Sequence, residues 1–327
     1  MQARFTKGRS RQNPWRCAAH IVWKLSLLVL PMNSFAQDAA PQASLLQDES
    51  SADELNAVSP AGCTFQALNV PNGFVSSASG VNNIGAIVGN FAGGPRNQDR
   101  SFLLFRGKFT FFIFPGSIAT DAFDINNQAQ IVGSYSDGRQ VHGFLAHSGG
   151  FETVDVPVAN TGAFATGIND SGDIVGFFFT SSNLGISFLR HGGHFTFFSF
   201  PGSDGTQAAS INDNSIIVGT YFQGQTNHGF MVRNGAFATI DFPGAVSTSA
   251  SKVNKAGVVV GTYLSQDRAQ HGFAFSISSG KFTSIDVPNT TGTSIVGIND
   301  QNEIVGGFST PASFNSLAFR GTCSAIF

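Results

Sequence analysis

The stretch GINDSGDIVG, residues 167–176, recurs in diverged form along the chain of 327 residues. The other copies begin at residues 80, 124, 210, 252 and 297 and read GVNNIGAIVG, DINNQAQIVG, SINDNSIIVG, KVNKAGVVVG and GINDQNEIVG. All copies share an asparagine at the third position, 42 to 45 residues apart, at Asn82, Asn126, Asn169, Asn212, Asn254 and Asn299. A motif that returns at such a regular interval indicates a repeat architecture.

Each repeat contains four short segments rich in β-branched and aromatic residues, typical of β-strands. In the third repeat they are AFATGI, DIVGFFF, ISFLR and HFTFFSF. Asn-Asp-Ser-Gly separates the first two and a glycine-containing turn separates the last two, which predicts two hairpins. Four antiparallel strands per repeat, six times over, predict an all-β, six-bladed β-propeller, because closing the ring protects the edges of the sheets. A β-solenoid and a two-sheet stack remain the alternatives.

The decapeptide resembles a ligand loop in composition, but its acidic positions drift between copies. The residue after the asparagine is Asp170 in one copy and Lys255 in another, and a lysine cannot ligate calcium. Only the asparagine and the Val-Gly pair that follows persist in all copies. Asparagine bonds its own backbone and tolerates a left-handed turn, so we interpret these six asparagines as structural turn residues.

The N-terminus has the features of an export signal. Basic residues precede the apolar run LSLLVLPM, and Ser34 and Ala36 form an A-x-A-like cleavage site. We predict a signal peptide over residues 1–36, cleaved after Ala36, with an uncleaved anchor as the alternative. Residues 37–61 are acidic and rich in Ala, Ser and Pro, which predicts a flexible linker before a repeat domain over residues 62–327.

Removing the predicted signal leaves 12 basic against 20 acidic residues, a net charge of −8. Such a chain lacks the basic patch that nucleic-acid binding needs. The chain has 34 Phe against 3 Tyr and 2 Trp, and a Phe core requires no buried hydrogen-bond partners. Both tryptophans, Trp15 and Trp23, lie in the predicted signal, which weakens a carbohydrate-stacking function without excluding it.

The repeats resemble bacterial extracellular proteins of the HAF repeat family, whose units contain GIN(D/N)xGxIVGxY, then HGF, then GxFxxIDxPG. The fourth repeat carries INDNSIIVGTY, HGF and AFATIDFPG within residues 211–244, whereas the HGF piece is RSF, ISF and NSL in three other repeats. The resemblance covers about residues 62–327. It implies a secreted or cell-envelope repeat protein without an established activity.

When the repeats are aligned, two equivalent positions, here called columns, carry the same titratable residue in three repeats and suggest a functional interpretation. His142, His228 and His271 share one column, but equivalent positions on separate blades point in different directions, so we predict no metal site and no cofactor. The second column holds Asp155, Asp241 and Asp286, for which we expect a structural role at the strand ends. Neither a Gly-x-Ser-x-Gly context nor a Cys-His arrangement is present, so we predict no catalytic residues.

Two function classes follow. The first is a non-enzymatic binding module, a monomer in the secreted or periplasmic space, with an unknown protein or glycan as partner. The second is a hydrolase or lyase, acting on a substrate such as a polysaccharide, with its site in the central channel. An enzyme would need several polar residues that break the repeat at one channel mouth, and the sequence shows too few, so we favour binding.

Two expectations concern ring closure and the channel. Cys63 and Cys323 open and end the repeat region, each in a segment that fits the last strand of a repeat, so the termini meet and form a disulfide. If the first strand of each repeat is innermost, Asp124 and Lys252 are the only charged residues at the position two residues before the motif asparagine. They lie opposite each other, and we predict that they face the channel and mark its polar ligand site.

Overall fold

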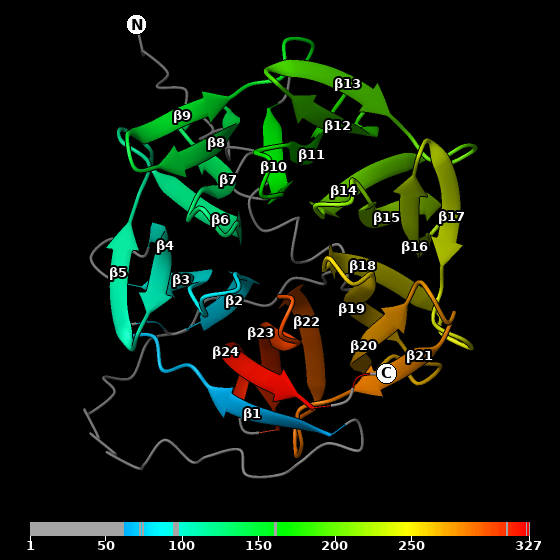
Figure 1. Cartoon of the computed structure of the whole chain (residues 1–327). Coiled ribbons are helices and arrows are strands. Elements are labelled where there is room, and N and C mark those ends of the chain that lie inside the picture. The colour runs from blue at the N-terminus through cyan, green and yellow to red at the C-terminus, as the bar shows by residue number, and fades with distance from the viewer. Residues whose placement is uncertain are drawn as a thin grey trace, which may run out of the picture.

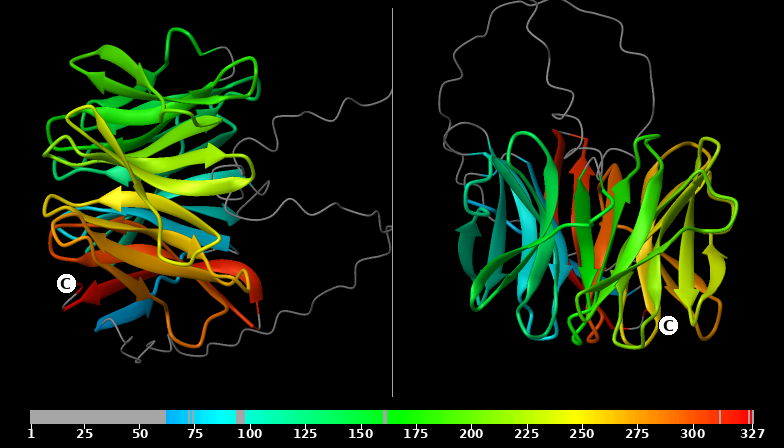
Figure 2. Two further views of the ribbon diagram at one scale, coloured as in Figure 1. Left: turned by 90° about the vertical axis from the view of Figure 1, so that its right-hand side faces the viewer. Right: turned by 90° about the horizontal axis from the view of Figure 1, so that it is seen from above.

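The computed structural model describes residues 62–326 apart from 72, 74, 94–97, 160, 161, 312 and 325. The predicted signal peptide and linker lie outside these residues. The described residues form β-strands and turns and no α-helix, arranged as sheets around a central axis (Figures 1 and 2). No helix in this part of the chain is long and apolar enough to cross a membrane.

The sequence repeats correspond to successive sets of four strands, here called repeats 1 to 6. The first strand of each repeat lies nearest the axis (Figure 1). In repeat order these inner strands are β2 (Val75–Val81), β6 (Ala119–Ile125), β10 (Ala163–Ile168), β14 (Gly205–Ile211), β18 (Ser247–Val253) and β22 (Gly292–Ile298). The second strands are β3 (Ile87–Gly93), β7 (Ile131–Ser136), β11 (Ile174–Phe179), β15 (Ile217–Gln223), β19 (Val258–Leu264) and β23 (Glu303–Thr310).

The remaining strands continue outward in the same order. The third strands are β4 (Gln98–Phe105), β8 (Val141–His147), β12 (Gly185–His191), β16 (Thr226–Arg233), β20 (Gln270–Ser276) and β24 (Ser313–Cys323). The outer strands are β5 (Lys108–Phe112), β9 (Gly150–Val154), β13 (His194–Phe198), β17 (Ala236–Ile240), β21 (Phe282–Ile285) and, for repeat 6, β1 (Cys63–Ala67).

The sheets number four of four strands each and one of eight strands. Repeats 1 to 4 are separate blades, whereas repeats 5 and 6 share the large sheet. The prediction of a β-propeller is therefore confirmed as an all-β, propeller-like fold, but the predicted six separate sheets are not all present. The joint between repeats 5 and 6 is one parallel residue pair, Gln270 with Gly292.

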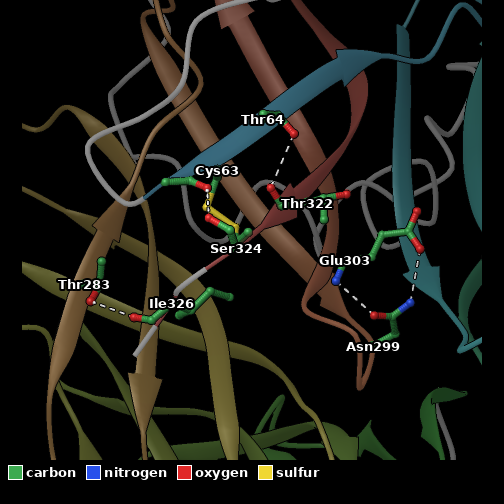
Figure 3. The surroundings of a disulfide bond; sticks show 10 residues. Cys63, Thr64, Thr283, Asn299, Glu303, Thr322, Ser324 and Ile326 are labelled. Atoms are coloured by element: carbon green, nitrogen blue, oxygen red, sulfur yellow. Dashed lines mark hydrogen bonds between the residues drawn. A yellow bond between two sulfur atoms is a disulfide. The ribbon is translucent and has the colours of Figure 1, made fainter.

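Ring closure comes from the N-terminal strand. β1 pairs antiparallel with β24, so the start of the described chain completes the last repeat, and Cys63 and Cys323 form a disulfide across that pair (Figure 3). The predicted disulfide is confirmed. The assignment of Cys323 to a last-strand segment is wrong, because Cys323 ends the third strand, which is long enough to pair along the whole of β1.

The core explains both the many phenylalanines and the Val-Gly pairs. One phenylalanine on the third strand of each repeat is 0% exposed: Phe102, Phe144, Phe188, Phe230, Phe273 and Phe319. Each ring packs against the motif glycine on the second strand. A Cβ on Gly219 would lie 2.8 Å from the Phe230 ring and 2.2 Å from the Gln207 carbonyl, closer than real Cβ contacts. Glycine is therefore required there by packing rather than by turn geometry.

Every inner strand contains a β-bulge three residues before the motif asparagine. The bulge residues, skipped in the pairing register, are Ser79, Phe123, Thr166, Ala209, Ser251 and Val296. A bulge breaks the alternation of faces along a strand. The residues two and four positions before the motif asparagine, which a regular strand would place on one face, are therefore on different faces here.

Candidate functional site

The motif asparagines form a hydrogen-bonded ring around the axis. Each side-chain Nδ2 donates to the backbone carbonyl of the motif asparagine in the next repeat, from Asn82 to Asn126 (3.0 Å) and onward until Asn299 donates to Asn82 (3.0 Å). All six are at most 5% exposed. The same side chains also hold the turn, as expected: Oδ1 of Asn212 accepts from the backbone N–H groups of Asn214 and Ile216.

A second ring lies one residue further along. The backbone N–H of Asn127 donates to Oδ1 of Asp170 at 2.8 Å, and four other repeats repeat this contact with the side chain of the next repeat. The link from Asp213 to Lys255 is missing, because a lysine side chain has no acceptor atom. Instead the Lys255 ammonium lies 4.0 Å from the Asp213 carboxylate.

Asp124 and Lys252 meet across the axis as a buried ion pair. Asp124 is 1% exposed and Lys252 is 9% exposed, and Nζ of Lys252 contacts Oδ2 of Asp124. Asp124 also accepts the backbone N–H groups of Ile125 (2.8 Å) and Ile168 (3.0 Å). The two residues thus lie at the channel axis and bind each other. Their role as a ligand site stays a prediction.

Two hollows lie on opposite sides of this ion pair and share no lining residue. The smaller, about 60 Å³, is surrounded by the motif turns and includes Lys252 and Lys255. The larger, about 170 Å³, opens toward the connections between consecutive repeats, and we call it the crossover cavity. All six bulge residues line it, together with Phe177, Gln207, Ala208, Thr220, Phe222, Asn227, Ser249, Ala250, Thr262, Gln270 and Ser294.

Some polar side chains of the crossover cavity form hydrogen bonds within the protein and others do not. Thr166 donates to the Ala208 carbonyl, and Thr262 bonds Ser294 at 3.0 Å. By contrast, five others make no hydrogen bond to the described residues: Gln207, Thr220, Ser249, Ser251 and Gln270. These five belong to repeats 4 and 5, so one wall of the cavity presents polar groups that a ligand could bind.

Asp121 extends the wall of repeat 2 toward the cavity mouth. Asp121 pairs with Ser134, and the equivalent pair in repeat 4 is Gln207 with Thr220, both of which line the cavity. Its strand contributes the bulge residue Phe123 to the lining, two residues further in. Burial, and then the nearby Asp99 carboxylate, raise the pKa of Asp121 from 3.8 to about 7. The sequence analysis did not single out this residue.

The histidine and aspartate columns form pairs rather than a shared site. Nδ1 of each histidine lies within 3.1 Å of an aspartate oxygen of its own repeat, in the pairs His142–Asp155, His228–Asp241 and His271–Asp286. A tyrosine ring stacks on each histidine, with centroids 4.9 to 5.0 Å apart. These contacts tie the third strand to the end of the outer strand in repeats 2, 4 and 5, which fits a structural role.

The sequence contained a sign of these pairs. Histidine, aspartate and tyrosine occur together in repeats 2, 4 and 5 and are absent together from the same columns of the other three repeats. Evidence for the cavity in the sequence was weaker, because the residues at the positions of Gln207, Ser249 and Gln270 differ between repeats, as exposed residues usually do. Among the described residues, no group of three or more His, Cys, Asp or Glu side chains is placed to hold a metal ion.

No protein-family model and no curated protein match the chain. Solved structures of β-propellers are similar to it. AofleA from Arthrobotrys oligospora is 13% identical over 80% of this chain and 87% of that chain, with a TM-score of 0.53. A putative TolB from Agrobacterium tumefaciens is 10% identical over 65% and 80%, with a TM-score of 0.52. A virginiamycin B lyase from Staphylococcus aureus, solved with quinupristin, is 10% identical over 80% and 99%, with a TM-score of 0.49.

At such low identities the likeness shows the propeller fold alone. The fold is therefore that of a propeller module, and the particular role has to come from the residues of this chain.

Proposed function

We propose that this protein is a non-enzymatic binding module whose ligand occupies the crossover cavity. The observation that carries the proposal is the convergence of five polar side chains without protein partners on one wall of that cavity. All five side chains are only half-buried, so water or a ligand completes their hydrogen bonds in the cavity. The Asp124–Lys252 pair lies on the axis between this cavity and the smaller hollow at the motif turns and lines only the latter, through Lys252.

The proposed place of action is the cell envelope or the extracellular space. The disulfide suggests an oxidising compartment. Together with the predicted signal peptide, it supports export. From the HAF-like motifs we further propose an exported HAF repeat protein that acts as a monomer on a protein or glycan ligand.

We also propose that the ring consists of six blades, with repeats 5 and 6 as separate blades. Repeats 5 and 6 meet through the single pair Gln270 and Gly292, whereas strands within a repeat pair over four to seven residues. The ring of motif asparagines passes through repeats 5 and 6 with the same contacts as through the others.

The binding module is tested by screening the exported protein against small soluble ligands and glycans by thermal shift. A ligand of the cavity raises the melting temperature of the original protein and loses most of this effect in the Gln207→Ala variant. Gln128→Ala is the matched control, because Gln128 is exposed at a motif turn on the opposite face. A ligand whose effect is equal in both variants would contradict the cavity as the site.

A channel hydrolase or lyase is the second candidate, and Asp121 is the observation in its favour. A carboxylic acid whose pKa is raised to about 7 beside a second carboxylate is the arrangement that acid–base catalysis uses. Turnover of a polysaccharide by the exported protein, abolished by Asp121→Asn, would support the enzyme and contradict the non-enzymatic proposal.

A further inference from the structure

The chemistry of the unbonded side chains limits what the crossover cavity can take. Gln207 and Gln270 offer primary amides, and Thr220, Ser249 and Ser251 offer hydroxyls. Each of these groups both donates and accepts hydrogen bonds, and none carries a charge. A complementary ligand therefore also presents groups that donate and accept. Hydroxyl groups have this property, whereas a carboxylate only accepts and an ammonium only donates.

Aromatic surface accompanies these polar groups. Phe123, Phe177 and Phe222 line the same cavity, from repeats 2, 3 and 4. Phe177 is almost fully buried, but Phe222 is only half-buried and lies on the strand next to Gln207. A ligand with hydroxyl groups at its edge and C–H groups on its face would satisfy the amides and cover the Phe222 ring together.

The size of the cavity points to one ring of such a ligand. Its volume of about 170 Å³ lies below the roughly 300 Å³ at which sites for drug-sized molecules begin. The cavity shares no lining residue with the hollow on the other side of the ion pair, so a longer chain cannot pass through the ring. Any further part of the ligand must extend out of the mouth, between the connections of the repeats.

Charge at the mouth restricts the ligand further. No charged side chain lines the cavity within the described residues. On the side opposite repeat 5, Asp121 extends the wall of repeat 2, with Asp99 close enough to disfavour its ionised form. Above about pH 7, where Asp121 has lost its proton, these two acidic groups repel a carboxylate, sulfate or phosphate group on the ligand.

We infer that the crossover cavity binds a single uncharged polyhydroxylated ring, such as the terminal monosaccharide unit of a neutral glycan. This inference rests on the proposed function and names the ligand class of the same site. Gln207 and Gln270 bond the ring hydroxyls, Phe222 covers one face of the ring, and the acidic mouth excludes anionic sugars.

The test is titration calorimetry of the exported protein with methyl glycosides of glucose, galactose, mannose, xylose and fucose. Galacturonate and glucose 6-phosphate are the anionic probes, and glutamine and phenylalaninamide are the non-sugar probes. We expect at least one neutral glycoside to bind, and its charged counterpart to bind at least about fivefold more weakly at pH 8, a difference of roughly 1 kcal/mol.

Variants connect the binding to the cavity. Gln207→Ala, Gln270→Ala and Phe222→Ala each weaken the glycoside at least about tenfold, while Gln128→Ala leaves it unchanged. Gln207→Glu is a second variant of similar size, in case a truncation disturbs the fold, and it weakens the glycoside as well. Thermal melts of every variant show whether the fold is intact.

The outcomes separate the inference from the proposed function. Binding of a non-sugar probe with the same sensitivity to Gln207→Ala would leave the binding site in place and overturn the saccharide. Glycoside binding that no cavity variant changes would overturn the inference and place the binding elsewhere. No binding of any neutral glycoside at about 10 mM, tenfold above a dissociation constant of about 1 mM, would also overturn it.

Discussion

Asn299 and Asn82 are joined by a hydrogen bond across 217 positions of the chain. Nδ2 of Asn299 donates to the carbonyl oxygen of Asn82 at 3.0 Å, and both residues are buried. This bond links the last repeat to the first and completes a ring that the other motif asparagines continue. The ring is thus closed twice, on its outer side by β1 and the disulfide and at its axis by asparagine side chains.

The asparagine ring is tested by the Asn212→Asp variant. The carboxylate keeps the turn acceptors but cannot donate to the Asn254 carbonyl, and it is buried against that oxygen. We expect a loss of about 2 to 4 kcal/mol in the free energy of unfolding, measured by urea denaturation. Asn234→Asp in an exposed hairpin turn is the control and should change stability by less than about 0.5 kcal/mol.

The disulfide is tested by the Cys63→Ala/Cys323→Ala double variant. Because the bond closes a loop of 260 positions, its loss destabilises the folded state by at most about 5 to 6 kcal/mol in the chain-entropy model. The unfolding midpoint in urea measures this change. Thiol titration of the denatured, exported protein should find neither cysteine free, and two free thiols would contradict the bond.

The buried ion pair predicts an unequal effect of single and double substitutions. Lys252→Ser leaves the Asp124 carboxylate buried without a counter-ion and should cost about 3 to 5 kcal/mol. Adding Asp124→Ser should recover part of that loss, because Ser210 occupies the same column of repeat 4 while buried. A double variant less stable than Lys252→Ser in the same denaturation experiment would show that the pair does not bind as described.

The gap in the second ring predicts a stabilising change. Lys255→Asn supplies the missing acceptor for the backbone N–H of Asp213, as Asn127 does for Asn83. The exposed Lys255–Asp213 pair that is lost contributes little. We expect a gain of about 0.5 to 1.5 kcal/mol in the free energy of unfolding. Lys281→Asn, on an exposed turn outside the rings, should give no comparable gain.

Asp121 predicts a pH dependence of stability with a defined sign. Its pKa is about 7 in the folded protein and 3.8 is the ordinary value, so between these pH values the folded state keeps a proton that the unfolded state releases. Stability from this group is therefore full at acidic pH and falls as the pH rises to about 7, by at most about 1.4 kcal/mol per unit.

The Asp121→Asn variant isolates that contribution. It cannot ionise, so its advantage over the original protein should grow from pH 4 to pH 7 and then stay constant. Denaturation curves of the two proteins across this range measure the difference, in which the other titrating groups cancel. Parallel stability curves for the two proteins would contradict a raised pKa.

The sequence by itself determined the features that repeat locally. The spacing of the motif asparagines, the four strand segments and the hairpin turns are all set by residues close together in the chain, and they were enough to predict an all-β propeller. The cysteines at the two ends of the repeat region were enough to predict the closing disulfide. The surplus of phenylalanine indicated a core whose aromatic rings need no hydrogen-bond partners.

Only the tertiary structure decided the features that depend on residues far apart. The bulge before each asparagine interrupts the alternation of faces along the strand, and the bulge residue, such as Thr166, lines the crossover cavity. Whether Gln207 is satisfied, and whether Asp121 holds its proton, depends on which neighbouring repeats approach and how much water they exclude. Burial and hydrogen bonding between repeats are properties of the closed ring, and no single repeat encodes them.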